Sequence, residues 1–267
     1  MNHLLRALAP ITERGWEQIE EEAKKQLTEA LAARKLVDFE GPRGFDHAAT
    51  NLGRTDAVAE APVGRVGATR RRVLPLVEVR APFALSRAEL MDIDRGAEDP
   101  DLDDLGVAAR DIALAENTAV FHGWRAAGIE GISEASPHSA ITLGEDLTTC
   151  PNHVAEAVEL LLRSGVGGPY GLALGPDLYT GVIQTTEHGG YPLFEHLRHI
   201  LEGPLVWAPG VEGAVVVSLR GGDFVFDCGQ DLAIGYDSHD ADEVRLYFVE
   251  TFSFRATTPE AAVALRS

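Results

Sequence analysis

A chain of 267 residues, 45% of them hydrophobic, is long enough to bury one sizeable core. Its 42 acidic residues outnumber its 23 lysines and arginines, and the net charge of −19 disfavours binding to nucleic acid and to anionic membranes. No stretch approaches the roughly 20 apolar residues of a membrane span, and the N-terminus lacks the pattern of a secretory signal, which together predict a cytoplasmic protein. Cys150 and Cys228 are far apart and have no cysteine nearby, so we expect two reduced thiols rather than a disulfide framework or a zinc cluster.

The first expected element is an amphipathic helix over residues 13–34. Thr12 is suited to cap it, and apolar residues recur at every third or fourth position as far as Leu31. Residues 36–39 follow as a short extended run, which the Gly-Pro pair at 41–42 ends.

Residues 50–80 have a different composition, because glycines interrupt them and large apolar residues are scarce before Val73. Positive charge dominates this segment: Arg54, Arg65, Arg70, Arg71, Arg72 and Arg80 face only Asp56, Glu60 and Glu78. A cationic hairpin that is poor in core residues cannot bury much surface by itself. The segment therefore predicts an arm that lies on something outside itself.

The acidic stretch 89–104 is interpreted either as a solvated turn or as a partner for a neighbour's cationic arm. Helical periodicity then predicts a long helix over 105–128. Beyond it we expect helices and strands to alternate, followed by a strand-rich closing part: helices at 154–164, 177–184 and 193–201, strands at 170–174, 206–207 and 214–219, and strands again over 224–254. The chain is predicted to form one α+β body with a long projecting arm.

No catalytic or metal-binding constellation stands out. There is no phosphate-cradling loop, dinucleotide fingerprint or nucleophile elbow. His196 and His199 could share a helix face as metal ligands do, but no third ligand is visible nearby. Cys150 has no base at a telling spacing, and His239 is interpreted as a turn residue. We predict no enzymatic activity and no bound metal.

Strings spread over nearly the whole chain, in order, resemble the encapsulin shell proteins of family 1, the linocin-type proteins. The strings include Leu8-Ala9-Pro10-Ile11-Thr12, Pro82-Phe83-Ala84-Leu85, Gly168-Pro169-Tyr170, Arg220-Gly221-Gly222-Asp223-Phe224 and Gly229-Gln230-Asp231-Leu232. The resemblance implies the fold of tailed-phage major capsid proteins, the HK97-like fold. A peripheral domain would comprise residues 1–49, 81–131 and 223–267, an extended loop residues 50–80, and an axial domain residues 132–222.

The resemblance also implies a function, which is enclosure. An icosahedral homo-oligomer of about 60 subunits would enclose a cargo enzyme that carries a C-terminal targeting peptide. The cargo would be a ferritin-like protein for iron storage or a dye-decolorising peroxidase for oxidative-stress defence. Carried over by position, the peptide groove lies between the first helix and the peripheral strands and uses Leu27, Leu31, Arg34, Leu36, Asp38, Asp231, Ile234 and Tyr236.

The resemblance implies one further site, and the charge of the arm indicates a second. A loop around the five-fold opening would contain Thr186, Glu187, His188, Gly189, Gly190 and Tyr191, and its Gly-Gly pair indicates a looser turn than the family usually has. The arm would use Arg70, Arg71 and Arg72 between subunits, with Arg70 and Arg72 on one strand face and Arg71 on the other.

One departure from the family concerns a cofactor. Some members stack a flavin on a tryptophan where this chain has Arg87, so no flavin or other cofactor is predicted. Two other interpretations remain open: a true phage major capsid protein of the same fold, and, less favoured, a hydrolase.

Overall fold

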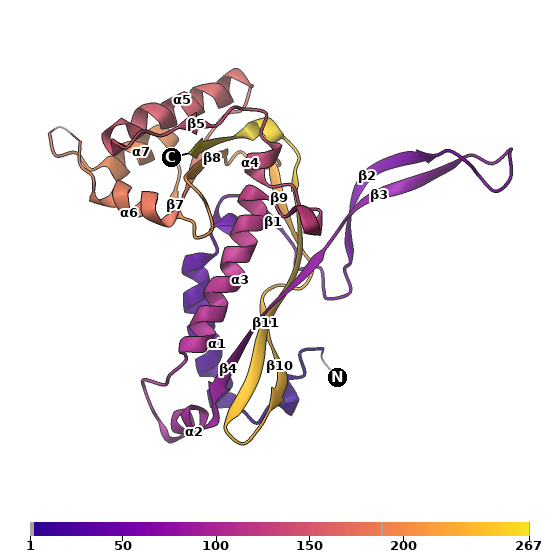
Figure 1. Ribbon diagram of the computed structural model, residues 1–267, viewed down its shortest axis with the longest axis vertical. Helices are drawn as coiled ribbons and strands as arrows, with labels where there is room; N and C mark the ends of the chain where they lie inside the picture. Colours follow the sequence, from indigo (N-terminus) through magenta and orange to yellow (C-terminus); the bar gives the residue numbers. More distant parts are fainter. Residues whose placement is uncertain (1–2, 188, 267) are drawn as a thin grey trace.

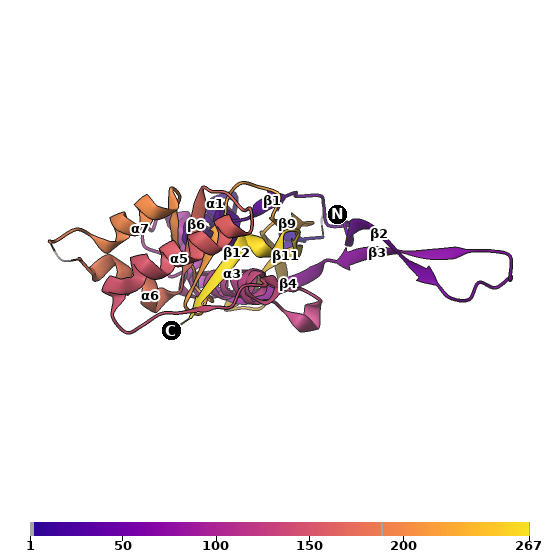
Figure 2. The same cartoon turned by 90° about the horizontal axis from the view of Figure 1, so that it is seen from above.

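The computed structural model describes residues 3–187 and 189–266. Two sheets and their helices form the body, and a two-stranded arm projects from it (Figure 1). Figure 2, seen from above, shows the arm extending well beyond the helices and sheets. The predicted α+β class with a projecting arm is confirmed. None of the helices in the described residues is long and apolar enough to cross a membrane.

The first sheet has strand order β1-β9-β11-β10, with β4 pairing on β11. Its strands are β1 (Asp38–Glu40), β4 (Val77–Ser86), β9 (Phe224–Cys228), β10 (Ala233–His239) and β11 (Glu243–Ala256). The long β11 pairs antiparallel with β4 and β10 through its first part and with β9 through its last part. This arrangement makes β11 the central strand of the sheet.

Two long helices, α1 (Glu13–Ala30) and α3 (Asp103–His122), lie side by side against this sheet (Figure 1). Thr12 Oγ1 accepts a hydrogen bond from the Gly15 N–H at 3.1 Å and so caps α1 as expected. The apolar stripes of both helices are buried against β4, β10 and β11, forming one hydrophobic core. The short 3-10 helix η1 (Arg6–Leu8) precedes α1, and α2 (Arg87–Arg95) precedes α3.

Helix α1 ends at Ala30 instead of at residue 34, because a buried side chain from α3 terminates it. Asn117 Oδ1 accepts hydrogen bonds from the N–H groups of Ala32 and Ala33, each at 3.0 Å. Asn117 Nδ2 donates to the carbonyl of Ala30 at 2.9 Å. The chain turns there into the 3-10 helix η2 (Ala33–Lys35).

Helix α3 is likewise shorter than the predicted 105–128. It stops at Gly123, whose φ of 88° is a left-handed conformation suited to glycine. A tight turn with the 3-10 helix η3 (Arg125–Ala127) follows, closed by a bridge between Trp124 and Ile129.

The acidic stretch 89–104 is more regular than a turn, because α2 occupies its first part and Ser86 Oγ caps that helix.

The second sheet has strand order β5-β12-β8-β6-β7 and contains the larger core. Its strands are β5 (Ile141–Thr142), β6 (Tyr170–Leu174), β7 (Leu205–Trp207), β8 (Ala214–Ser218) and β12 (Ala262–Arg266), and the helices packed around them are α4 (Ile132–Ala135), α5 (Cys150–Arg163), α6 (Pro176–Gln184) and α7 (Leu193–Leu201). Short 3-10 helices η4 (Leu147–Thr149) and η5 (Pro259–Ala261) precede α5 and β12. The strand at 170–174 and the helix at 193–201 are confirmed as predicted, whereas α5 begins earlier, with Pro151 tolerated in its first turn.

The end of the chain departs from the expected domain division. We expected residues 223–267 to belong with the first sheet, but β12 pairs antiparallel with β8 and parallel with β5. Its side chains, such as Val263 and Leu265, are fully buried in the second core. The chain therefore returns to the second sheet after β11.

The arm consists of β2 (Ala49–Val58) and β3 (Ala68–Pro75), which pair with each other and with no other strand in the part of the chain that the structure describes. It is shorter than the predicted 50–80, since β4 begins at Val77 and already pairs with β11. Most of its side chains are exposed, including Val63 and Val66 in the connecting loop. As expected from its composition, the arm has no core of its own.

Candidate functional site

A groove of about 380 Å³ lies between α1 and the segment that leads from β9 into β10. Its residues come from η1, α1, η2, β10, β11 and the turns that follow α1 and β9: Arg6, Glu20, Ala23, Lys24, Leu27, Thr28, Leu31, Arg34, Asp231, Leu232, Ala233, Ile234 and Phe248. The floor is apolar because Leu27, Ile234 and Phe248 belong to the core of the first sheet. Charged side chains stand around this floor, an arrangement suited to holding an extended peptide by alternate side chains.

Of the eight residues assigned to the groove from the sequence, five line it: Leu27, Leu31, Arg34, Asp231 and Ile234. The other three lie elsewhere. Leu36 is only 3% exposed and belongs to the core of the second sheet. Asp38 accepts a hydrogen bond from the Gly222 N–H at 2.5 Å, and Tyr236 is buried with its hydroxyl 2.6 Å from His239 Nδ1.

Several groove residues were not predicted. Glu20 and Lys24 lie on the same helical face as Leu27 and Leu31, so the spacing of α1 contained that signal. Phe248 reaches the groove because it pairs directly with Ile234 across β10 and β11. A pairing of that kind is set by strand register and not by local sequence.

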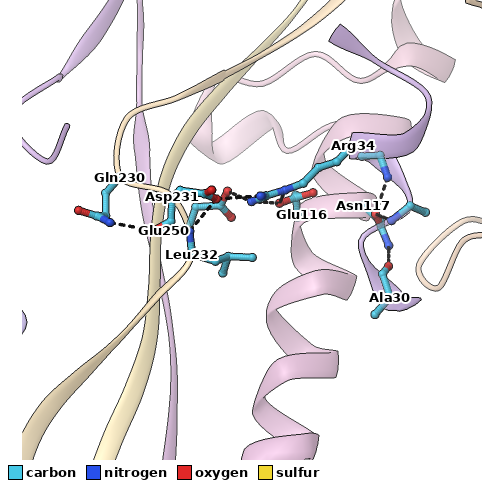
Figure 3. A network of polar contacts seen from close by, with 10 residues as sticks. Ala30, Arg34, Glu116, Asn117, Gln230, Asp231, Leu232 and Glu250 are labelled. Carbon is cyan, nitrogen blue, oxygen red and sulfur yellow. Dashed lines mark hydrogen bonds and ion pairs between the residues drawn. The ribbon is translucent and has the colours of Figure 1, made fainter. Parts of the chain in front are cut away.

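The charged end of the groove is built around Arg34 (Figure 3). Its Nε donates to Glu116 Oε2 at 2.9 Å, its Nη1 donates to Asp231 Oδ1 at 2.7 Å, and its Nη2 donates to Glu250 Oε1. The guanidinium also lies 5.0 Å from the ring centre of Phe39 and 5.4 Å from that of Phe226. One cation is thus held by three carboxylates from three different parts of the chain.

The surroundings of this network shift the pKa values of Arg34, Glu116 and Glu250. Burial raises the pKa of Glu250 well above the ordinary value of a carboxyl group, and the charge of Glu116 raises it further. Burial also raises the pKa of Glu116, although the neighbouring Arg34 opposes that effect. Burial lowers the pKa of Arg34, but the surrounding carboxylates more than offset this, so the guanidinium stays charged. Burial, reinforced by Glu250, raises the pKa of Cys228 to about 12.

Among the described residues, one group could offer three ligand atoms to a metal: Cys228, Asp231 and Glu250, whose atoms lie within 4.8 Å of one another. Arg34 already donates hydrogen bonds to both of these carboxylates. A metal ion there would face a fixed positive charge, so the arrangement does not fit a metal site.

The loop between α6 and α7 is held by side-chain and backbone contacts. Glu187 lies within hydrogen-bond distance of His196 Nδ1, at 2.9 and 3.0 Å from its two carboxylate oxygens. Thr186 forms a bridge with Pro192, and Gly189 and Gly190 have positive φ values of 103° and 81°. His188 lies outside the described residues. His196, considered above as a metal ligand, is therefore engaged with the loop.

On the arm, Arg70 and Arg72 share a face, as predicted from strand alternation. Their guanidinium nitrogens lie 3.7 and 3.8 Å from Asp56 carboxylate oxygens, whereas Arg71 pairs in register with Thr55. The side chains of Arg70 and Arg72 are 78% and 55% exposed. Two arginines thus share one carboxylate and retain excess positive charge.

Comparison with solved structures identifies the fold. The fold resembles that of a virus-like particle from Pyrococcus furiosus, with a TM-score of 0.63, 16% identity, and coverage of 94% of this chain and 99% of that one. It also resembles a chain of Mycobacterium phage Bobi, with a TM-score of 0.56, 16% identity, and coverage of 89% and 90%. The protein has the HK97-like capsid fold that the sequence predicted.

Sequence comparison identifies the family. Residues 1–253 match the family described as "encapsulating protein for peroxidase" (Linocin_M18). The chain is 51% identical to a type 1 encapsulin shell protein of Rhodospirillum rubrum, over 100% of this chain and 97% of that one. It is 45% identical to a type 1 encapsulin shell protein of Mycobacterium tuberculosis, over 99% of each. The chain belongs to the encapsulin shell protein family. This result favours the predicted encapsulin shell protein over the two alternatives, a phage capsid protein and a hydrolase.

Proposed function

We propose that this protein is the repeating subunit of a closed icosahedral shell of about 60 copies, acting by enclosure and not by catalysis. The arm is the observation that carries the proposal. It extends away from both cores, pairs with no other strand of the described residues and leaves most of its side chains exposed, so a stable position requires a neighbouring subunit (Figures 1 and 2). Shell formation by repeated copies would provide that neighbour at every boundary.

The interior of this shell would hold a cargo protein by the groove between α1 and β10. An extended C-terminal peptide would place apolar side chains over Leu27, Leu31 and Ile234, with Arg34 and Asp231 binding its polar groups. A peroxidase or a ferritin-like protein is the proposed class of cargo. The first agrees with the description of the family whose model the chain matches.

The loop between α6 and α7 and the cellular location of the shell are also part of the proposal. The loop with Glu187, Gly189 and Gly190 would surround the five-fold opening, where the His196 contact keeps it in place. The shell would work in the cytoplasm, in keeping with the two free cysteines, both buried.

The test of assembly is the mass and shape of the purified protein. Light scattering and negative-stain microscopy should show hollow particles of one size at neutral pH. A monodisperse monomer or dimer would contradict the proposal.

The test of cargo binding uses a reporter fused to the C-terminal segment of the protein encoded beside this gene. Leu31→Asp should leave the particles intact but sharply lower co-purification of the reporter, because Leu31 is only partly buried and a charge in an apolar groove costs several kcal/mol. Leu162→Asp is the matched control, because Leu162 is exposed on α5 and away from the groove. Equal loading of both variants would refute the groove and leave the assembly proposal standing.

A further inference from the structure

The network around Arg34 contains more carboxyl groups than one arginine can neutralise. The side chains of Glu116 and Glu250 are 0% exposed, and Asp231 completes the set at the edge of the groove. If all three were ionised, one positive charge would face three negative charges beside the buried ring of Phe226 and the thiol of Cys228. Buried charge without compensation is avoided in folded proteins, and the usual remedy is to bind a proton.

The hydrogen bonds show where that proton belongs. Arg34 occupies one oxygen of each buried carboxyl group, Oε2 of Glu116 and Oε1 of Glu250. The remaining oxygens, Glu116 Oε1 and Glu250 Oε2, are buried and have no hydrogen-bond partner among the described residues. The same nitrogen of Arg34, Nη2, contacts Glu116 Oε2 at 2.9 Å and Glu250 Oε1, so the two carboxyl groups lie next to each other. Two ionised carboxylates this close in a buried site would repel each other, and a proton on one of them removes that repulsion.

We propose that Glu116 and Glu250 share one proton in the folded subunit, carried by Glu250 and accepted by Glu116, and that this protonated pair positions Arg34 at the end of the groove. The importance of Arg34 for the groove rests on the function proposed above, whereas the proposal of a shared proton is independent of that function. With the proton in place, Glu116 neutralises Arg34, Glu250 is neutral, and Asp231 supplies the remaining charge at the groove. Glu116 and Glu250 are then positioning residues, since neither lines the groove.

The groups that face this proton come from every element packed around it. Arg34 comes from η2, Glu116 from α3, Glu250 from β11, Asp231 from the turn after β9, and Cys228 from the end of β9. The Cys228 thiol stays neutral at physiological pH, because its pKa is raised to about 12. Release of the proton would place two adjacent buried negative charges beside Arg34, and their repulsion would loosen the junction of α1, α3 and β11.

The sign of the pH effect follows from the raised pKa of Glu250. The proton on Glu250 stabilises the folded subunit. This stabilisation is fully present below the ordinary carboxyl pKa of 4.5 and is lost as the pH rises through the higher pKa of Glu250 in the folded state. Other groups titrate over the same range, so the comparison must be made against a variant that lacks only this proton. Glu250→Gln is that variant, because a glutamine has nearly the same shape, donates a hydrogen bond and cannot ionise.

The direct test is infrared spectroscopy of assembled shells at pH 8, where exposed carboxyl groups have lost their protons. The wild-type shell should show the carbonyl band of a protonated carboxyl group, and Glu250→Gln should lack it. Glu243→Gln, on an exposed position of the same strand, is the control and should keep the band. Absence of the band in the wild type, its persistence in Glu250→Gln, or a stoichiometric metal ion in the purified shell would overturn the proposal.

The second test separates this role from a merely structural one. Glu250→Gln should assemble and, relative to the wild type, gain thermal stability as the pH rises from 5 to 9. Glu250→Leu keeps the bulk but loses the hydrogen bonds to Arg34 and Glu116, so it should assemble poorly at every pH. Parallel pH profiles for the wild type and Glu250→Gln would refute a shared proton, whatever the fate of the cargo groove.

Discussion

The hydrogen bonds of the Asn117 side chain allow the change in the free energy of unfolding to be predicted for one substitution. It is fully buried and bonds four backbone groups: the N–H groups of Ala32 and Ala33 and the carbonyls of Ala30 and Pro209. Asn117→Ala leaves the two N–H groups buried and without that acceptor. Each such group costs about 1–3 kcal/mol, so we expect a loss of roughly 4 kcal/mol in the free energy of unfolding. That is a large share of the roughly 5–15 kcal/mol typical of a folded domain.

The assay is thermal unfolding of the purified shell at fixed protein concentration, together with its yield of intact particles. Thr118→Ala is the matched control, because within the described residues the neighbouring Thr118 hydroxyl makes a single long hydrogen bond, to the Gly210 carbonyl at 3.4 Å. Asn117→Ala should melt well below both the wild type and this control. Cargo binding should also weaken in any particles that form, because Asn117 sets the turn that places Leu31 and Arg34. A melting temperature equal to that of Thr118→Ala would refute this reasoning.

Three other predictions concern the arm, the groove and the core. Joint replacement of Arg70 and Arg72 by Glu should weaken assembly and make it more sensitive to pH and salt, as followed by light scattering. The fold of the subunit should suffer less, and Arg163→Glu, on the exposed face of α5, should change neither. Leu31→Asp should lower reporter loading without reducing particle yield, whereas an unchanged loaded fraction would count against the groove. Leu36→Asp should instead prevent soluble expression, since it buries a charge in the core of the second sheet; intact particles with this substitution would contradict the assignment of Leu36 to that core.

Local patterns in the sequence predict much of the architecture. Helical periodicity located α1 and α7, and a short apolar run between turn residues located β6, because those elements bury a side that their own sequence defines. The arm was recognisable because a segment that is rich in arginine and poor in large apolar residues cannot build a core. Ordered strings along the chain showed the family resemblance, and the resemblance implied the fold. Five of the eight residues that it assigned to the groove line the groove in the structure.

Only the tertiary structure decided the ends of the elements and the contents of the charged network. Helix α1 ends at Ala30 because Asn117 approaches from 85 residues away, and β12 joins the second sheet through pairing that its own sequence does not specify. Arg34 meets Glu116 and Glu250 across separations of 82 and 216 residues. Glu116 does lie on the apolar face of α3, between Ile112 and Val120, so its burial could be anticipated from spacing. The contact between Glu116 and Arg34 could not be anticipated, because long-range contacts depend on how helices and strands pack. The protonation state of a buried carboxyl group likewise depends on neighbours that only the folded structure identifies.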